Sequence, residues 1–247
     1  MGRNITCRIT VSEKECSDTL MRLCRNSVYS YSNSIKEGYV TTPEGIRAGI
    51  CGKAICQDNI ISSVYGVNSI CIRIPRRIPG TGDTAYELLR EMSFQKGLIV
   101  WSIPGIGKTT LLRELISRLG SGDCSLRVSV VDTRHELGVG IKSSGLIDIL
   151  DGYPRAKGIE IAKRTMSPQI IVCDEISTDE DAIAILGAAE AGIPIVASTH
   201  AGSRDELFNN KCMREILASK CIGIYLGLLA QTPGDYKYDI YKKDLRF

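Results

Sequence analysis

The residues of this chain that could do chemistry are concentrated first in positions 98–115, LIVWSIPGIGKTTLLREL. An apolar run, a turn rich in proline and glycine, and an amphipathic run follow one another, as strand, loop and helix do in a phosphate-binding loop. In such a loop successive backbone N–H groups surround phosphates, a helix N-terminus adds a favourable dipole, a lysine adds charge and a hydroxyl binds magnesium. The pattern therefore predicts a nucleotide site.

Each residue type in the loop suits one task. Gly105 and Gly107 permit the tight backbone. We expect Lys108 to reach the β and γ phosphates, Thr109 to hold magnesium and Thr110 to lie near the α phosphate. The candidates for binding ATP and Mg²⁺ are Ser102, Ile103, Pro104, Gly105, Ile106, Gly107, Lys108, Thr109 and Thr110.

Ser102 stands where the phosphate-loop pattern has its first glycine. A serine can serve there only if its backbone has a negative φ, where a side chain costs nothing. The alternative is an ordinary strand, turn and helix that only looks like a nucleotide site.

A second signal is IIVCDE at positions 170–175, an apolar run that ends in two acids. Asp174 is the candidate that accepts a hydrogen bond from the water shell of magnesium, and Glu175 is the candidate general base toward the attacking water. Burying two adjacent carboxylates without a cation would be costly. The alternative is that both acids simply end a strand.

Two further runs, PIVASTH at 194–200 and VVDTRHE at 130–136, end in polar residues. Open sheets of parallel strands bind ligands at the carboxyl ends of their strands, and both histidines of the chain fall at such ends. We therefore expect His200 to contact the γ phosphate or the attacking water.

The elements that must position these residues divide into two regions. Residues 1–80 show helical spacing and then period-two segments with turn signals at 43–45, 57–59 and 66, which predicts an α+β domain with antiparallel hairpins. Residues 75–83 are rich in proline and glycine and are the predicted linker. From position 97 strands alternate with helices, so residues 81–247 are predicted to form an α/β domain with a mostly parallel sheet. The expected elements are strands at 98–102, 127–132, 169–174 and 194–199, helices at 85–94, from 107, at 156–166, at 180–191 and from 205, and two last strands around a turn at 233–234.

Composition excludes several classes of protein. The 247 residues are 43% hydrophobic, enough for a folded core. A net charge of +3 gives no argument for nucleic-acid binding. Ten cysteines include no Cys-x-x-Cys pair, and two histidines are too few for the usual zinc patterns, so we expect reduced thiols. The chain shows no secretion signal, and its longest apolar run near the end is too short to span a bilayer, so we expect a soluble, cytoplasmic protein.

Five stretches carry a resemblance to a known family: GYVTTPEGIRAGICGKA, SIPGIGKTTLLREL, VVDTRHELG, DILDGYPRAKGIEIAKRTMSPQIIVCDE and AAEAGIPIVASTHAGSRDEL. Together they cover most of residues 38–207, and the chain resembles the stage III sporulation protein AA family of endospore-forming bacteria. The family is related to the ring ATPases of type II secretion and type IV pili. The resemblance implies a RecA-like core and an ATPase in the mother-cell cytoplasm. It also implies a homo-oligomeric ring, a hexamer, which would serve a secretion-like channel through membrane proteins of the same operon.

The resemblance also assigns residues. Glu136 occupies the place of a family acid in the acidic box of secretion ATPases, and His200 that of their histidine box. Where the family usually has DERSE this chain has DTRHE, so Thr133 and His135 depart from it. An arginine from a neighbouring subunit or domain usually completes such a site. The candidates are Arg134, Arg155, Arg164, Arg73, Arg76 and Arg77, of which we favour Arg134 and Arg164.

The predicted catalytic set is therefore Glu175, Lys108, His200, Glu136 and Arg134, with Thr109 and Asp174 at the metal. Two other functions stay open: a nucleic-acid-dependent ATPase, and a scaffold that binds nucleotide without turnover, which Ser102 would favour. A small-molecule kinase is disfavoured by Glu175 and by the lack of an arginine-rich lid.

Overall fold

A computed structural model describes residues 7–42, 44–73, 78–121, 124–141, 146–229 and 237–243 of the chain. The chain forms two compact units, residues 1–75 and residues 76–247. The two domains that we predict, 1–80 and 81–247, remain a prediction in their bounds. No helix in these described ranges is long and apolar enough to cross a membrane.

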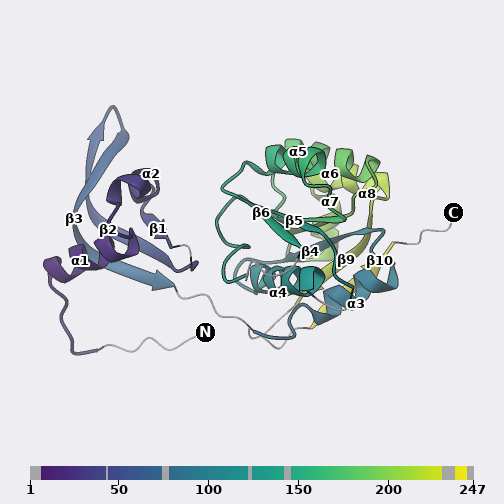
Figure 1. Cartoon of the computed structure of the whole chain (residues 1–247), viewed down its shortest axis with the longest axis horizontal. Coiled ribbons are helices and arrows are strands. Elements are labelled where there is room, and N and C mark those ends of the chain that lie inside the picture. The colour runs from purple at the N-terminus through teal and green to yellow at the C-terminus, as the bar shows by residue number, and fades with distance from the viewer. Residues whose placement is uncertain are drawn as a thin grey trace. The chain divides into compact units, whose positions relative to one another are not determined.

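The N-terminal unit places two helices and a 3₁₀ turn against a three-stranded antiparallel sheet in the order β1-β2-β3 (Figure 1). Its elements are α1 (Glu13–Leu23), η1 (Val28–Tyr31), α2 (Ser32–Lys36), β1 (Tyr39–Thr41), β2 (Arg47–Gln57) and β3 (Ile60–Arg73). A capping box between Ser12 and Glu15 starts α1. This arrangement confirms the prediction of helices followed by antiparallel hairpins.

The β2–β3 hairpin is closed by Asp58 and Asn59, which both have positive φ, +50° and +60°. Positive φ at both central residues is the mark of the two-residue turn that suits twisted strands. The turn predicted at Gly66 is wrong, because β3 runs through this residue. Gly66 (φ +56°) lies in β3 opposite the interval between Cys51 and Lys53 of β2, where the register shifts and a bulge uses the conformational freedom of glycine. Of the turn predicted at 43–45, residue 43 lies outside the described residues.

The C-terminal unit is built on a seven-stranded sheet in the order β10-β9-β4-β8-β7-β5-β6, parallel except for β10. Its strands are β4 (Gly97–Ser102), β5 (Val128–Asp132), β6 (Ile147–Asp151), β7 (Ile170–Glu175), β8 (Ile195–His200), β9 (Ile222–Leu228) and β10 (Tyr238–Lys242). Its helices are α3 (Asp83–Glu91), α4 (Lys108–Ser121), α5 (Arg155–Thr165), α6 (Asp179–Glu190), α7 (Arg204–Asn209) and α8 (Lys211–Ser219). The alternation of strands and helices thus produced the predicted α/β fold.

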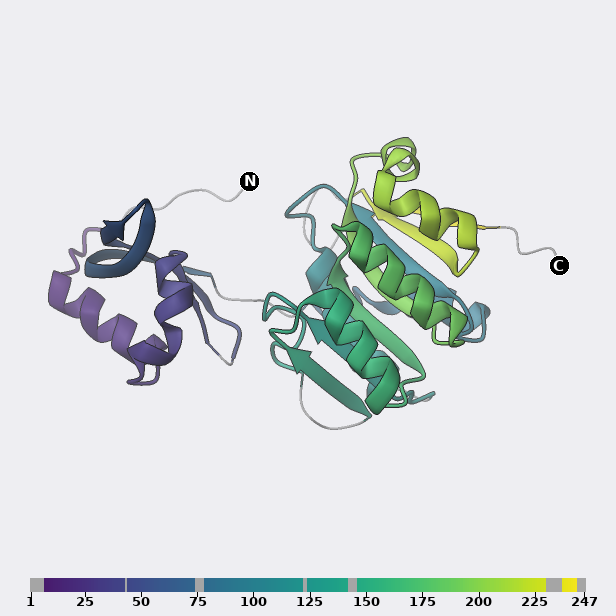
Figure 2. The same cartoon turned by 90° about the horizontal axis from the view of Figure 1, so that it is seen from above.

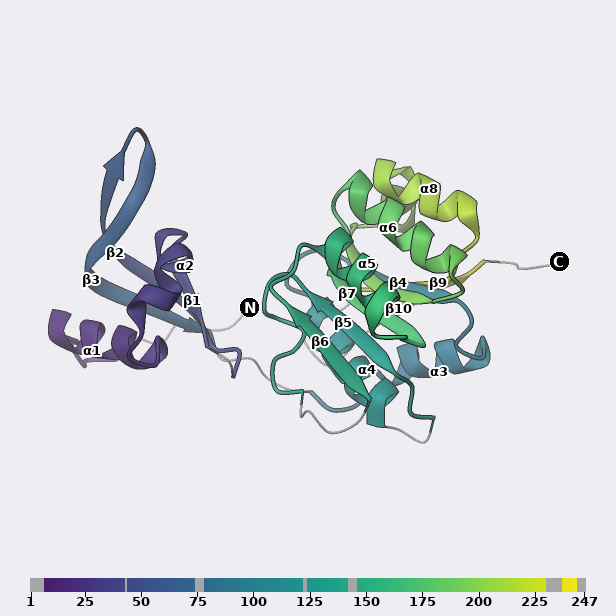
Figure 3. The same cartoon turned by 45° about the horizontal axis from the view of Figure 1, so that its top comes forward.

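Both faces of this sheet are covered. Figure 2 shows α5, α6 and α8 over one face, and Figure 3 shows α3 and α4 on the other. Alternate residues of β4 enter the two cores: Ile99 and Trp101 pack with the first group of helices, and Leu98 and Val100 with the second. A parallel strand buried on both faces needs a continuous apolar run, which is why residues 98–101 contain no polar residue.

Two features of the C-terminal unit differ in detail from what the sequence predicts. Strand β6 was not predicted, because its short sequence IDILD contains two acids without a regular alternation, and it lies at a sheet edge where most of its side chains are exposed. The helix expected from residue 205 is two helices, since Asn210 ends α7 in extended backbone and caps α8. The two final strands are present as β9 and β10, and the turn predicted at 233–234 lies outside the described residues.

Gly227 allows β9 to lie beside β4, the strand that leads into the phosphate loop. A Cβ there would lie 2.3 Å from Cζ2 of the buried Trp101. We expect Gly227→Ala to lower the free energy of unfolding by about 1–3 kcal/mol, the usual cost of overpacking. The matched control is Gly187→Ala on α6, whose Cβ would be 3.5 Å from Lys163 Nζ and which should be neutral or stabilising. Urea unfolding of both variants tests this, and equal stabilities would contradict it.

Candidate active site

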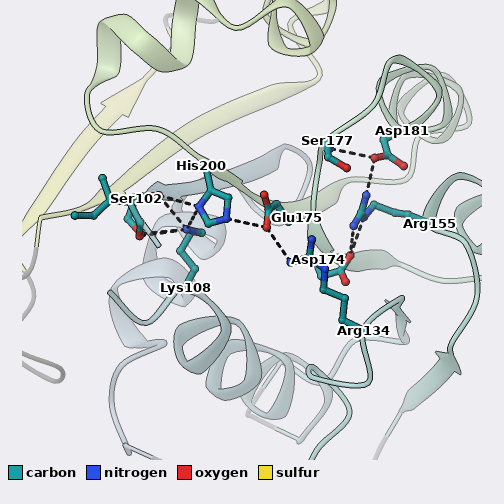
Figure 4. Close-up of polar contacts among 10 residues, drawn as sticks. Ser102, Lys108, Arg134, Arg155, Asp174, Glu175, Ser177, Asp181 and His200 are labelled. Carbon is teal, nitrogen blue, oxygen red and sulfur yellow. Dashed lines mark hydrogen bonds and ion pairs between the residues drawn. The ribbon is translucent and has the colours of Figure 1, made fainter. Parts of the chain in front are cut away.

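Strand β8 lies between β4 and β7, so the carboxyl ends of all three strands meet at one edge of the sheet. In the parallel register Ser102 is opposite His200, and Glu175 is opposite Ser198. Motifs far apart in the sequence are thereby brought together. Figure 4 shows Ser102, Lys108, His200 and Glu175 in one group of polar contacts.

The phosphate loop occupies residues 103–107, and α4 begins directly after it at Lys108. Gly105 and Gly107 have φ values of +82° and +122°, which side chains rarely adopt, whereas Ser102 is outside the positive-φ region. The backbone conformation at Ser102 therefore does not require glycine. The backbone and hydroxyl oxygens of this serine both accept hydrogen bonds from Lys108. Thr109 and Thr110 lie in the first turn of α4, at the helix end that favours anions.

Lys108 is buried, with 8% of its surface exposed. Its Nζ donates to Ser102 O at 2.9 Å, to Ser102 Oγ at 3.3 Å and to Ile103 O at 3.5 Å, and it lies 2.8 Å from His200 Nδ1. Burial lowers the pKa of Lys108 to about 8, against the opposing attraction of Glu175. The amine is held by uncharged acceptors, which leaves its charge available to an anion.

His200 links the lysine to the predicted base. Its Nδ1 accepts from Lys108, and its Nε2 lies 2.9 Å from Glu175 Oε2, so the contacts assign the tautomer with the proton on Nε2. Arg134 Nη1 donates to the same Oε2 at 3.2 Å. Four of the five predicted catalytic residues are therefore joined in one chain of contacts.

Asp174 and Glu175 face different partners, as adjacent residues of a strand do, and β7 is also irregular at its end. Val172 pairs with Val196 and Glu175 with Ser198, so β7 carries one residue more than β8 over this interval. Such a bulge redirects the side chains that it contains. Asp174 lies 8% exposed beside Arg155 rather than beside His200.

Arg155 is a correction to the sequence analysis, where it is one candidate for an arginine that reaches a neighbouring subunit. Its side chain is 7% exposed and is engaged within its own chain. Nε donates to Asp174 Oδ1 at 2.7 Å, and Nη1 donates to Asp181 Oδ2 at 2.5 Å. Neither this role nor that of Asp181 was found from sequence, because the three residues belong to different elements and no local motif joins them.

The other arginine candidates lie elsewhere. Arg164 is near the C-terminal end of α5, whereas the site is at the N-terminal end of that helix. Arg73 belongs to β3 of the N-terminal unit, and Arg76 and Arg77 lie outside the described residues. Arg134, 55% exposed at its side chain, lies at the site of its own chain.

The loop after β5 is tied down by Asp132. Its Oδ1 accepts from the Glu136 N–H and its Oδ2 from the Gly138 N–H, both at 2.8 Å. Arg113 Nε of α4 donates to Glu136 O at 2.5 Å. Glu136 thus contributes backbone atoms to the loop, and the catalytic role predicted for it remains a prediction. His135 Nδ1 lies 2.7 Å from Asp151 Oδ1.

The residues at this edge fit a nucleotide with Mg²⁺. Asp174 Oδ2 and Thr133 Oγ1 are buried acceptors without a hydrogen-bond partner in the described chain. Orphaned acceptors of this kind suit donors that a ligand brings, such as metal-bound waters. No group of three or more His, Cys, Asp or Glu side chains within the described ranges is placed to hold a metal ion alone. The phosphates would therefore have to supply ligands to magnesium beside Thr109.

The sheet order, the loop after β4 and the antiparallel N-terminal sheet define a RecA-like α/β fold that solved secretion ATPases share. The ATPase DotB of Legionella pneumophila has this fold, with a TM-score of 0.60, 18% identity, and coverage of 91% of this chain and 66% of that chain. The pilus retraction motor PilT, solved with bound ADP, has a TM-score of 0.55 and 19% identity, covering 81% of this chain and 60% of that chain. The chain thus spans less than two thirds of either structure.

The sequence profile of the family described as sporulation stage III, protein AA matches residues 3–244. Stage III sporulation protein AA of Bacillus subtilis (strain 168) is 32% identical over 235 residues, which cover 91% of this chain and 76% of that protein. The chain belongs to this family. The family resemblance and the secretion-ATPase fold predicted from the sequence are confirmed.

The buried amine of Lys108 makes stability depend on pH. Its pKa is about 8 in the folded chain and about 10.4 in an unfolded one, so between these values the unfolded chain binds more protons and the stability contribution of Lys108 rises with pH. Below pH 8 the amine of Lys108 is charged in the folded chain, and burying this charge costs stability. Lys108→Met removes that cost. We expect its free energy of unfolding, relative to wild type, to fall by about 1–2 kcal/mol between pH 7 and 9.5.

The control for this measurement is Lys211→Met, which removes an exposed lysine on α8. Urea unfolding at four pH values should give a flat difference between this variant and wild type. A flat difference for Lys108→Met as well would show that burial does not perturb this amine.

Proposed function

We propose that the C-terminal unit binds ATP with Mg²⁺ and hydrolyses it. The observation that carries this proposal is the chain of contacts from Lys108 through His200 to Glu175, placed beside a glycine-rich loop at a helix N-terminus. Lys108 binds the β and γ phosphates, and Glu175 is the general base. Its Oε2 is held by His200 and Arg134, and the other carboxylate oxygen is the one that we assign to the proton of water.

The remaining residues have supporting roles in this proposal. Bound ATP with Mg²⁺ would supply the phosphoryl group that water attacks. Residues 102–107 wrap the phosphates with their N–H groups, except for Pro104, which has none. Thr109 contributes its hydroxyl to the metal, and Asp174 accepts from a metal-bound water through Oδ2. When a phosphate takes the Lys108 amine, His200 loses its partner at Nδ1. His200 can thereby report occupancy of the loop to Glu175.

We further propose that hydrolysis drives a homo-oligomeric ring, a hexamer, that serves a channel between mother cell and forespore. Membership in the sporulation stage III protein AA family and the fold shared with the ATPase DotB and the motor PilT support this proposal. Such a protein would lie in the mother-cell cytoplasm and meet the membrane through membrane-protein partners of the sporulation channel. Nucleic acid is not an expected partner.

The two phosphate-site residues can be separated by substitution. We expect Lys108→Ala to abolish ATP binding, because the loop loses its cation. Glu175→Gln should retain binding and slow hydrolysis at least ~100-fold, the scale of losing a general base. Nucleotide affinity and phosphate release, measured for both variants, check this. Normal turnover by Glu175→Gln would move the role of base to Glu136.

The form of the enzyme is tested by phosphate release against protein concentration, with the oligomer mass recorded in the same samples. A rate per subunit that rises as the ring assembles supports a shared site. Binding without turnover at any concentration, and without stimulation by single-stranded DNA or RNA, supports the nucleotide-binding scaffold instead. Stimulation by nucleic acid supports the nucleic-acid-dependent ATPase.

A further inference from the structure

A buried cluster of one arginine and two acids lies beside the proposed nucleotide site. Arg155 is the first residue of α5, Asp174 lies near the end of β7 and Asp181 lies in the first turn of α6. Their side chains are 7%, 11% and 6% exposed. Figure 4 shows the guanidinium between the two carboxylates.

Asp181 is held independently of the arginine. Its Oδ2 accepts from the N–H groups of Ser177 and Thr178, at 3.1 and 3.2 Å, in the capping box that begins α6. Its position is therefore set by the helix backbone. Because Nη1 of Arg155 bonds to this anchored oxygen, the planar guanidinium has a fixed direction.

Asp174 has no such backbone support and is oriented by Arg155. Two guanidinium nitrogens, Nε and Nη2, contact the same oxygen, Oδ1, at 2.7 and 2.6 Å. The other oxygen, Oδ2, is buried and has no hydrogen-bond partner in the described part of the chain. A buried charged acceptor without a donor is costly, so this half of the carboxylate is prepared for a donor that arrives from outside.

The charges in the cluster indicate that the donor to Asp174 Oδ2 carries positive charge. One guanidinium faces two carboxylates, and near Asp174 the negative charge of Asp132 is opposed by the positive charge of Arg134, so three carboxylates face two guanidinium groups. Buried carboxylates in excess of cations are stabilised by a further cation. Waters bound to a divalent cation supply both the positive charge and the hydrogen-bond donor.

We propose that Arg155 is a positioning residue that holds Asp174 by Oδ1 and leaves Oδ2 for a water bound to the magnesium of the nucleotide. This inference rests on the proposed function. It assigns to Arg155 an effect on how strongly Mg²⁺ increases the affinity for nucleotide, here called the Mg²⁺ coupling. This effect acts only through Asp174. A merely structural ion pair between α5, α6 and β7 would change stability and leave that coupling as it is.

The test uses the full-length protein and measures the affinity for ADP in the presence of Mg²⁺ and in the presence of EDTA. The ratio of the two affinities is the Mg²⁺ coupling, and it needs no turnover. We expect Asp174→Asn to reduce this ratio about 10-fold or more, the scale of one hydrogen bond to a charged group. Arg155→Met should reduce it by a similar factor, and the double variant by no more than the larger single effect.

Two further variants complete the design. Lys157→Met removes a positive charge from an exposed position of the same helix and should leave the ratio unchanged. Arg155→Lys keeps the charge without the planar fork, so it should lose part of the coupling. If Arg155→Met does not fold, the cycle with Asp174→Asn is carried out with Arg155→Lys.

The possible outcomes distinguish a failure of this inference from a failure of the proposed function on which it rests. A wild-type protein that does not bind ADP overturns the proposed function. A wild-type protein with normal Mg²⁺ coupling, and folded Arg155 variants with the same coupling, overturns only the role of Arg155. Losses that add in the double variant would also overturn it, because they would show that Arg155 does not act through Asp174.

Discussion

The burial of the large sheet on both faces is the constraint on which the rest of the C-terminal unit depends. With α5, α6 and α8 on one side and α3 and α4 on the other, the central strands are mostly apolar where they face the helices, and their charged groups lie at their ends. Because the strands are parallel and β8 lies between β4 and β7, the phosphate loop, the acids and His200 meet at one edge. The site is thus a consequence of how the apolar residues are covered.

At that edge two opposite charges are buried near the proposed ligand site, and each has its own partners. Lys108 and Asp174 are both buried, yet they do not pair with each other. The lysine is held by carbonyl and hydroxyl oxygens and by His200, and the aspartate is held by Arg155. A direct ion pair would satisfy both charges and remove the reason to bind a phosphate and a cation. Because the two charged groups have separate partners, both are stabilised and both can still bind a ligand, a phosphate at the lysine and a cation at the aspartate.

The chain of contacts also suggests how the site responds to its ligand. His200 cannot hold Lys108 and release it to a phosphate at once, so occupancy of the loop changes the partners of the imidazole. The same ring contacts Glu175, which Arg134 also holds. Under the proposed function, binding in the loop would thereby be coupled through two contacts to the predicted base. In a family with the fold of secretion motors, such a link is a natural place for nucleotide state to be sensed.

The sequence by itself determined the local features: the apolar run before the loop, the glycines that allow positive φ, the acids at 174 and 175, and the alternation of strands and helices that specifies the α/β fold. These are readable because they depend on residues close together in the chain. Only the tertiary structure decided that β6 forms an edge strand, that β7 shifts register where the two acids lie, and that Arg155 lies inside its own chain between Asp174 and Asp181. Each of these depends on packing between elements distant in sequence, where local spacing carries no information.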